Sequence, residues 1–169
     1  DFFFKTTTYR TSIKDALLYN NNFHGGTGYT NTKEDLKQEG IEMDFVLKRN
    51  NERLSIFNTV STSKQQDGTQ QLNRPDSTYG LNYLKKFRSN LFGAFNLNIN
   101  YKHYGKVFDY APTITKVDST DIMNLSLTKK ISSNLWSINL SNLLDENYQR
   151  PHGYSQEGRR VRLNFKKSY

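Results

Sequence analysis

Apolar and polar residues alternate with a period of two in eight separate segments of the chain. The alternation is clearest over residues 91–102, where Leu97 and Ile99 alternate with Asn96, Asn98 and Asn100. Successive side chains of a β-strand point to opposite faces, so this period predicts strands with one apolar and one polar face. No segment shows a helical period. The eight segments are 3–13, 40–48, 54–63, 77–85, 91–102, 123–128, 136–141 and 160–166.

Polar residues occupy the second face of nearly every predicted strand. Hydrophobic residues make up only 34% of the chain, below the ~45–50% of typical soluble domains. Aromatic residues reach 14%, which argues against a disordered chain. A soluble barrel packs its interior with apolar side chains, and a soluble sheet would need a covering layer that no predicted helix supplies. Because lipid can cover the apolar face, a membrane barrel is favoured over a soluble β-barrel.

The connections between the predicted strands alternate between long and short. In an up-and-down antiparallel sheet, alternate connections lie at opposite ends, so all the short turns emerge at one end. Short periplasmic turns and long extracellular loops are typical of outer-membrane barrels. The short connections are residues 49–53, 86–90 and 129–134, and the long ones are 14–39, 64–76, 103–120 and 145–157.

The chain carries a net charge of +8, and many of its basic residues gather at the short turns. Long basic side chains at a membrane surface hold their charge at headgroup level. Trp136 and Phe87 lie where an aromatic girdle is expected. A nucleic-acid-binding protein would gather its charges on one face with stacking aromatics, so no nucleic-acid partner is expected. The basic residues at the turns are Lys48, Arg49, Arg53, Lys85, Lys86, Arg88, Lys129 and Lys130.

Sequence signals for catalysis and for metal binding are missing. The chain has no Cys, and His24, His103 and His152 do not have the spacing of metal ligands. No Gly-x-Ser-x-Gly elbow occurs. The neighbouring carboxylates Asp145 and Glu146 lack a second positioned partner for acid–base chemistry. We therefore expect no enzyme activity, no metal and no cofactor.

The stretch from residue 142 to the end combines several motifs. It contains Asn142-Leu143-Leu144-Asp145-Glu146-Asn147-Tyr148, then Gly153-Tyr154, Gly158-Arg159 and a closing strand that ends on Tyr169. This order resembles the C-terminus of the TonB-dependent outer-membrane receptors. Gly40-Ile41-Glu42 and Asn73-Arg74-Pro75 resemble strand starts of the same family, so the resemblance spans almost the whole chain. The spacing is most similar to that of the cobalamin receptors, although siderophore receptors share most of these motifs.

The resemblance implies a fold class and an extent. Residues 1–169 would form the C-terminal portion of an all-β, antiparallel transmembrane barrel of the 22-stranded type, contributing about eight strands. The plug domain and the earlier strands of such a receptor lie outside this sequence, which begins Asp1-Phe2 without Met. We expect the chain to be a fragment of a longer multi-pass β-barrel in the bacterial outer membrane.

The resemblance also implies a function, which is active transport rather than chemistry. Such a receptor captures a scarce, large nutrient, and energy delivered through TonB then displaces the plug without breaking a bond in the nutrient. The implied ligand is cobalamin in preference to a ferric siderophore. The other implied partners are outer-membrane lipid and the TonB system, which would act through the N-terminal part that this sequence does not contain.

Ligand contacts are implied in the upper lumen and the extracellular loops. By resemblance to the cobalamin receptors, Arg74 at the mouth of a strand and Tyr110 in the next long loop match positions that touch the ligand, with Phe108 beside Tyr110. In the alternative interpretation, Arg74 only solvates a strand end and the two aromatic residues pack the loop.

The closing strand is expected to carry an assembly signal. A terminal aromatic residue preceded by alternating apolar residues resembles the segment that the barrel-assembly machinery reads in outer-membrane proteins. Val161, Leu163, Phe165 and Tyr169 fit this pattern. Lys167 departs from it, because the family usually has an apolar or aromatic residue there.

Two other kinds of protein fit parts of the pattern. The first is a small, complete outer-membrane β-barrel with a structural or adhesion role, since a barrel of eight strands can close. The second is an outer-membrane barrel enzyme such as a lipase or protease. That enzyme would need a catalytic set on lumen or loop positions, and the sequence shows none.

Overall fold

The computed structural model describes residues 1–23, 26–31, 35–64, 71–90, 93–110 and 114–167, and the fold is built from β-strands. Side chains are described for these residues except 18–23, 26–27, 110 and 114. Among the described residues there is no helix whose length and hydropathy would let it cross a lipid bilayer. The predicted all-β fold class is confirmed.

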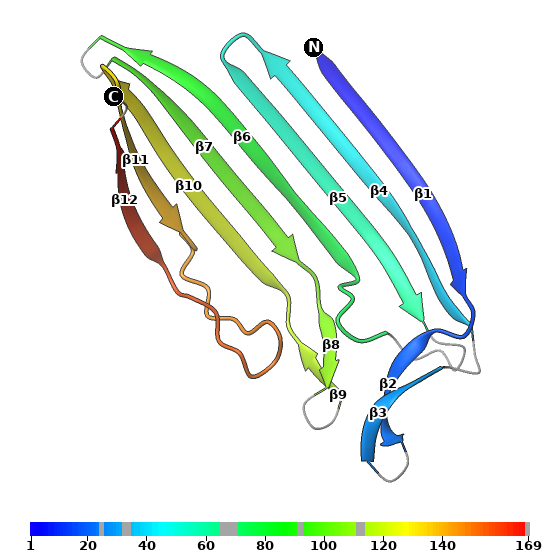
Figure 1. The fold of residues 1–169 in the computed structure, drawn as a ribbon. Helices are drawn as coiled ribbons and strands as arrows, with labels where there is room; N and C mark the ends of the chain where they lie inside the picture. The colour runs from blue at the N-terminus through cyan, green and yellow to red at the C-terminus, as the bar shows by residue number, and fades with distance from the viewer. Residues whose placement is uncertain (24–25, 32–34, 65–70, 91–92, 111–113, 168–169) are drawn as a thin grey trace.

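Eight strands form one antiparallel sheet in which every strand pairs with its neighbours along the chain (Figure 1). Each strand contains or overlaps one of the segments in which apolar and polar residues alternate, because that alternation suits a sheet with two different faces. The strands, in sheet order, are β1 Phe2–Ile13, β4 Leu36–Arg49, β5 Glu52–Lys64, β6 Ser77–Ser89, β7 Gly93–Tyr104, β10 Thr120–Ile131, β11 Asn134–Ser141 and β12 Arg160–Lys166.

Two further hairpins lie inside long connections, and the sequence pattern did not predict them. The first consists of β2 Leu17–Phe23 and β3 Gly26–Asn31, and the second of β8 Val107–Tyr110 and β9 Ile114–Val117. Their strands are short and do not alternate apolar with polar residues, so period-two analysis treated both stretches as loops. The second hairpin extends the line of β7 and β10 beyond the end of the main sheet (Figure 1).

The strand register places most of the apolar residues of the eight strands on one face. One row across the sheet consists of Phe2, Leu47, Leu54, Tyr83, Ile99, Leu125, Leu140 and Val161. The next row belongs to the opposite face and contains Ser55, Asn82, Asn100 and Asn124. A slip of one residue in any pair would move a whole strand's apolar set to the polar face, so the register and the alternation support each other.

Protein atoms do not cover the apolar face. The buried hydrophobic residues among those described are Leu36, Val107 and Val117, and all three lie at the long-loop end of the molecule. By contrast, Leu163 is 74% exposed and Phe165 is 53% exposed on the apolar face. An apolar surface of this extent is far larger than that of a typical soluble monomer. It therefore needs a covering that the chain itself does not provide.

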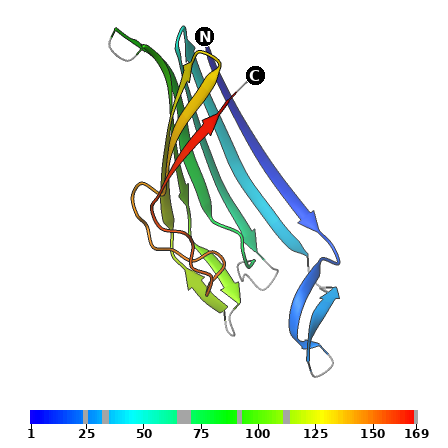
Figure 2. The same cartoon turned by 60° about the vertical axis from the view of Figure 1, so that its left-hand side comes forward.

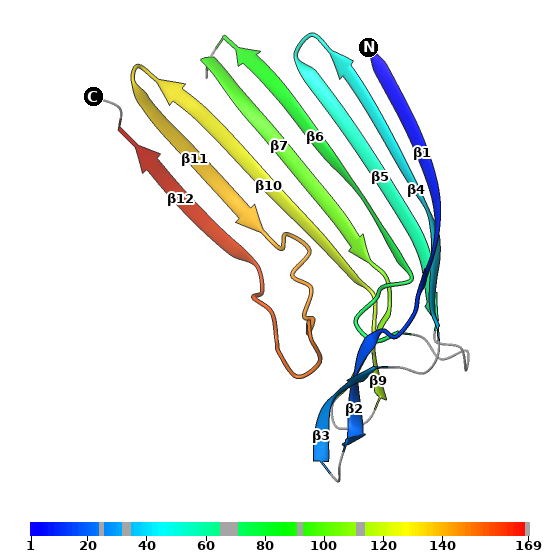
Figure 3. The same ribbon diagram turned by 45° about the vertical axis from the view of Figure 1, so that its right-hand side comes forward.

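The sheet is open and curved like a section of a barrel wall (Figures 2 and 3). β1 and β12 lie at its two edges, and no pairing between them occurs among the described residues. A closed eight-stranded barrel, which the small-barrel alternative requires, is therefore not the arrangement seen. Short turns emerge at one end of the sheet and long connections at the other, as the loop lengths predicted (Figure 1).

Replacing Gly80 by Ala is expected to lower the free energy of unfolding by about 1–3 kcal/mol, as overpacking does. A Cβ on Gly80 would lie 2.3 Å from the Tyr101 carbonyl oxygen and 2.9 Å from the Phe57 ring. β6 would therefore have to move away from its neighbours. The measurement is the thermal midpoint of the intact protein. Gly158→Ala is the control, because its nearest contact is at 3.5 Å; an equal loss in both variants would contradict the close-approach explanation.

Candidate functional site at the long-loop end

Three segments that are distant in sequence meet where the long connections leave the sheet. Hydrogen bonds join the chain before β6 to the β8 region, from Asn73 N to Phe108 O at 2.7 Å and from Asp76 N to Lys106 O at 3.4 Å. The connection between β11 and β12 packs against the same hairpin, where the His152 amide donates to Asp109 Oδ2 at 2.8 Å. This end of the sheet is therefore a folded surface built from three loops.

At this surface, two cationic side chains lie against the ring of one tyrosine. Tyr104 is the last residue of β7 and faces the polar side together with its cross-strand partners Thr78 and Thr120. The Arg150 guanidinium lies 4.7 Å from the centre of the Tyr104 ring, and Lys102 Nζ lies 4.4 Å from it. Cations at these distances interact favourably with an aromatic face.

Arg150 is held in place by the backbone, and within the described part of the chain one of its donors is buried without a partner. Its Nη2 donates to the Gly105 carbonyl at 2.9 Å, and its Nε has no hydrogen-bond partner among the described residues. Burial lowers the pKa of the Arg150 guanidinium, and the neighbouring Tyr104 opposes that shift. An arginine stays protonated at neutral pH even so. The site can therefore offer positive charge and an aromatic surface to an anionic or π-rich ligand.

The structure brings two of the three predicted contact residues close together. Arg74 is exposed and follows Asn73, whose amide binds the Phe108 carbonyl. Phe108 is half-buried in β8. Tyr110 ends β8 and its backbone pairs with Ile114, while its side chain lies outside the described residues. Contact of these residues with a ligand stays a prediction.

Sequence reasoning missed Tyr104, Lys102 and Arg150 as a cluster. Arg150 is 46 positions from Tyr104 in sequence, and only the folding of the last loop brings them together. The available signal was Arg150 itself, a charged residue followed by Pro151 inside a motif-rich loop. That signal does not show which strand end the loop will reach.

The Asn142 side chain joins the two ends of the last loop, and this explains the motif that suggested the family. Asn142 Nδ2 donates to the carbonyls of Glu146 at 2.9 Å and Glu157 at 3.2 Å, and its Oδ1 accepts from the Glu146 amide at 3.0 Å. Asp145 Oδ1 accepts from the Arg159 amide at 2.9 Å. The motif is therefore a structural clasp, which holds the loop that carries Arg150.

Aromatic residues on the apolar face form a belt near each end of the strands. At the short-turn end, the rings of Phe87 and Phe95 stack at 5.0 Å and those of Trp136 and Phe165 lie 4.6 Å apart. At the long-loop end, Tyr79 stacks on His103 at 4.4 Å. The side chains of Tyr101 and His103 both contact Asp121 Oδ1, at 2.6 and 2.8 Å. Polar and aromatic rims around an apolar band are the features of a strand-built membrane surface.

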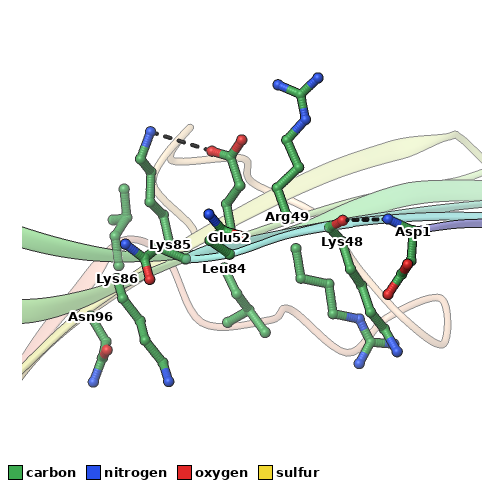
Figure 4. A pocket seen from close by; sticks show the side chains of 12 residues that line it. Asp1, Lys48, Arg49, Glu52, Leu84, Lys85, Lys86 and Asn96 are labelled. Carbon is green, nitrogen blue, oxygen red and sulfur yellow. Dashed lines mark hydrogen bonds and ion pairs between the residues drawn. The ribbon is translucent and has the colours of Figure 1, made fainter.

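Charged residues surround the short turns on both faces (Figure 4). Lys85 and Glu52 form an ion pair of 3.3 Å on the apolar side, and Lys85 Nζ lies 5.1 Å from the Phe87 ring. Lys86 and Asn96 extend on the other side of the sheet (Figure 4). The Lys85 ammonium thus lies toward the strand end and away from the apolar band, as expected for a basic side chain at a membrane surface.

Three of the four predicted assembly residues lie on β12. Val161, Leu163 and Phe165 are exposed on the apolar face of this edge strand. Tyr169 lies outside the described residues. The structure therefore leaves these three side chains accessible, and recognition by an assembly machinery stays a prediction.

The fold matches those of known outer-membrane receptors. No family profile and no curated sequence matches the chain. Among solved structures, it is similar to the ferric yersiniabactin uptake receptor FyuA of Yersinia pestis, with 15% identity over 97% of this chain and 26% of that one and a TM-score of 0.78. The ferripyoverdine receptor of the outer membrane of Pseudomonas aeruginosa gives 14% identity over 96% and 24%, with a TM-score of 0.76. The FrpB iron transporter of Neisseria meningitidis gives 13% identity over 97% and 28%, with a TM-score of 0.72.

These matches define the class of fold. The sheet is a section of a large antiparallel barrel of the kind found in TonB-dependent outer-membrane receptors. The chain spans about a quarter of the length of each of the three matched proteins. Those proteins are named as transporters or receptors, and none of the three names refers to cobalamin.

Proposed function

We propose that this chain is the C-terminal section of a TonB-dependent receptor barrel in the bacterial outer membrane. The observation that supports this proposal is the register, which gathers the apolar residues of eight strands on one uncovered face. Lipid covers that face, and the polar face lines the lumen. The aromatic belts near the two strand ends then lie at the two membrane surfaces.

In this proposal the chain supplies lumen wall, extracellular loops and an assembly signal. The long connections are extracellular and the short turns are periplasmic. TonB acts through the N-terminal part of the receptor, which lies outside residues 1–169. The barrel-assembly machinery reads Val161, Leu163 and Phe165 on the apolar face of β12 together with the terminal Tyr169.

The ligand contacts are proposed at the long-loop end. Arg74, Phe108 and Tyr110 come from the family resemblance. Arg150 and Tyr104 join them because a charged guanidinium lies over a ring on the polar face. The transported nutrient is large and scarce, and it crosses without chemical change.

Two ligand classes are candidates. The order and spacing of the sequence motifs favour cobalamin, whereas the structural neighbours are named for iron or for ferric siderophores. The pair of cations around Tyr104 suits an anionic ferric complex. Both classes must therefore be tested on the same protein.

The decisive experiment uses the intact receptor in an outer membrane. We expect saturable binding of either cyanocobalamin or a ferric siderophore, and uptake of that ligand that stops when an uncoupler collapses the inner-membrane proton gradient. Binding itself should survive the uncoupler. The proposal fails if the folded receptor binds neither class, or if uptake continues unchanged without the gradient.

Replacing Arg150 by Gln is expected to weaken ligand binding about 5- to 30-fold, because a partly desolvated cation–aromatic site contributes about 1–2 kcal/mol. The measurement is a binding titration with the ligand identified above. Lys106→Gln removes an exposed positive charge beside Gly105 and is the matched control. Equal weakening in both variants would mean that only net charge matters. Arg74→Gln, titrated in parallel, tests the contact implied by the resemblance.

A further inference from the structure

A groove lies on the apolar face near the short-turn end of β7, β10 and β11. Four apolar side chains line it, together with one cation, Lys129. Lys129 is the cross-strand neighbour of Trp136, so its side chain begins within the aromatic belt. The apolar lining residues are Phe95, Leu127, Trp136 and Ile138.

Lys129 has no anionic partner within the part of the chain that the structure describes. Its side chain is half-buried, yet it makes no hydrogen bond and no ion pair with any described residue. Lys85, the other lysine of this belt, is paired with Glu52 and lies over Phe87. A cation beside an apolar surface is stabilised when an anion neutralises it. Lys129 is therefore a position on this face where an external anion fits.

The groove and the cation together define the chemistry of an occupant. It must offer an apolar chain to Phe95, Leu127 and Ile138, and an anionic group within reach of Lys129 at the strand end. Charge complementarity selects an amphiphile with a negative headgroup, because a neutral or zwitterionic one leaves Lys129 without a net counter-charge.

We propose that this groove is a binding site for an anionic glycerophospholipid. One acyl chain lies along Phe95, Leu127 and Ile138, and the headgroup phosphate pairs with Lys129 Nζ beside the Trp136 ring. This inference rests on the proposed function, since it requires the apolar face to meet the membrane. It goes beyond that function by assigning a preferred lipid to one place on the barrel.

The test measures quenching of Trp136 fluorescence in the intact receptor. The receptor is reconstituted in vesicles that contain either brominated phosphatidylglycerol or brominated phosphatidylcholine, and Trp136→Phe supplies the background to subtract. Trp136 is the only tryptophan of residues 1–169. We expect phosphatidylglycerol to occupy the groove about fivefold more strongly, which corresponds to about 1 kcal/mol for one basic side chain at a membrane surface.

Lysine variants show whether Lys129 causes this preference. Lys129→Gln should abolish it, and Lys129→Arg should retain it. Lys130→Gln is the matched control, because it removes the same charge one residue away, at an exposed position of the opposite face. Heat-modifiable mobility on electrophoresis identifies the folded fraction of each variant.

The possible results separate the two proposals. Equal quenching by both lipids in the unsubstituted receptor overturns the lipid site and leaves the membrane barrel intact. A preference that persists in Lys129→Gln also overturns the assignment to Lys129. If neither brominated lipid quenches Trp136, the apolar face does not meet lipid, and both the site and the proposed function fail.

Discussion

If the apolar face meets lipid as proposed, replacing Ile99 by Arg should prevent the protein from assembling in the membrane. Ile99 lies on the apolar face between Tyr83 and Leu125. It lies four positions from Phe95 in one belt and four positions from His103 in the other, which places it near the middle of the apolar band. An arginine on the lipid side at that depth costs about 2–4 kcal/mol. Leu97→Arg should act in the same direction. The measurement is the amount of heat-modifiable receptor in the outer membrane.

Asn98→Arg is the control for this prediction, because it introduces the same residue beside Ile99 on the polar face. Asn98 lies between Leu84 and Ser126, and its Oδ1 has no hydrogen-bond partner among the described residues. An arginine there can extend into a watery lumen, so we expect normal assembly. If Ile99→Arg and Asn98→Arg assemble equally well, the lipid-facing assignment is wrong.

The positions of the main strands could be predicted because the alternation has a single physical cause. A residue such as Leu97 or Leu125 must face the apolar side, and its neighbour must face the other, so a period of two marks the strand directly. The order of the strands followed from the connection lengths. The register then followed from the need to keep apolar sets together. Each of these rules uses only the order of residues along the chain, so a single sequence is enough to apply them.

The additional hairpins and the cationic cluster could not be predicted in the same way. β8 and β9 are only four residues each, and their stability depends on buried contacts such as those of Val107 and Val117. Arg150 lies against Tyr104 because of the path of the loop between β11 and β12, and that path depends on many weak interactions. Local sequence patterns do not encode such contacts, so sequence reasoning could predict Arg74 and Phe108 as contact residues only through family resemblance.

The clasp at Asn142 links the recognisable motif to the proposed site. The residues that carry the family resemblance, Asn142 and Asp145, bond to the backbone of their own loop. They fix the two ends of the loop between β11 and β12, and Arg150 lies on that loop. A sequence motif can therefore be typical of a family because it fixes the fold of a loop, while other residues on that loop determine which ligand is bound.

Replacing Asn142 by Ala should both destabilise the loop between β11 and β12 and weaken ligand binding. Asn142 is 4% exposed, and its side chain makes three hydrogen bonds within the loop. At about 0.5–1.5 kcal/mol each, their loss lowers local stability by about 1.5–4.5 kcal/mol. We expect trypsin to cleave after Arg159 at least tenfold faster in the folded receptor, because cleavage follows the population of the open loop.

Two matched variants separate the causes of that loss. Asn142 has a φ of +48°, a conformation that glycine adopts without the penalty that alanine incurs. Asn142→Gly should therefore lose the three hydrogen bonds but remain about 1 kcal/mol more stable than Asn142→Ala. Asn147→Ala, at an exposed position of the same loop, should cleave at the unsubstituted rate. If Asn142→Ala leaves both cleavage and ligand affinity unchanged, Asn142 does not clasp the loop and the loop does not position Arg150.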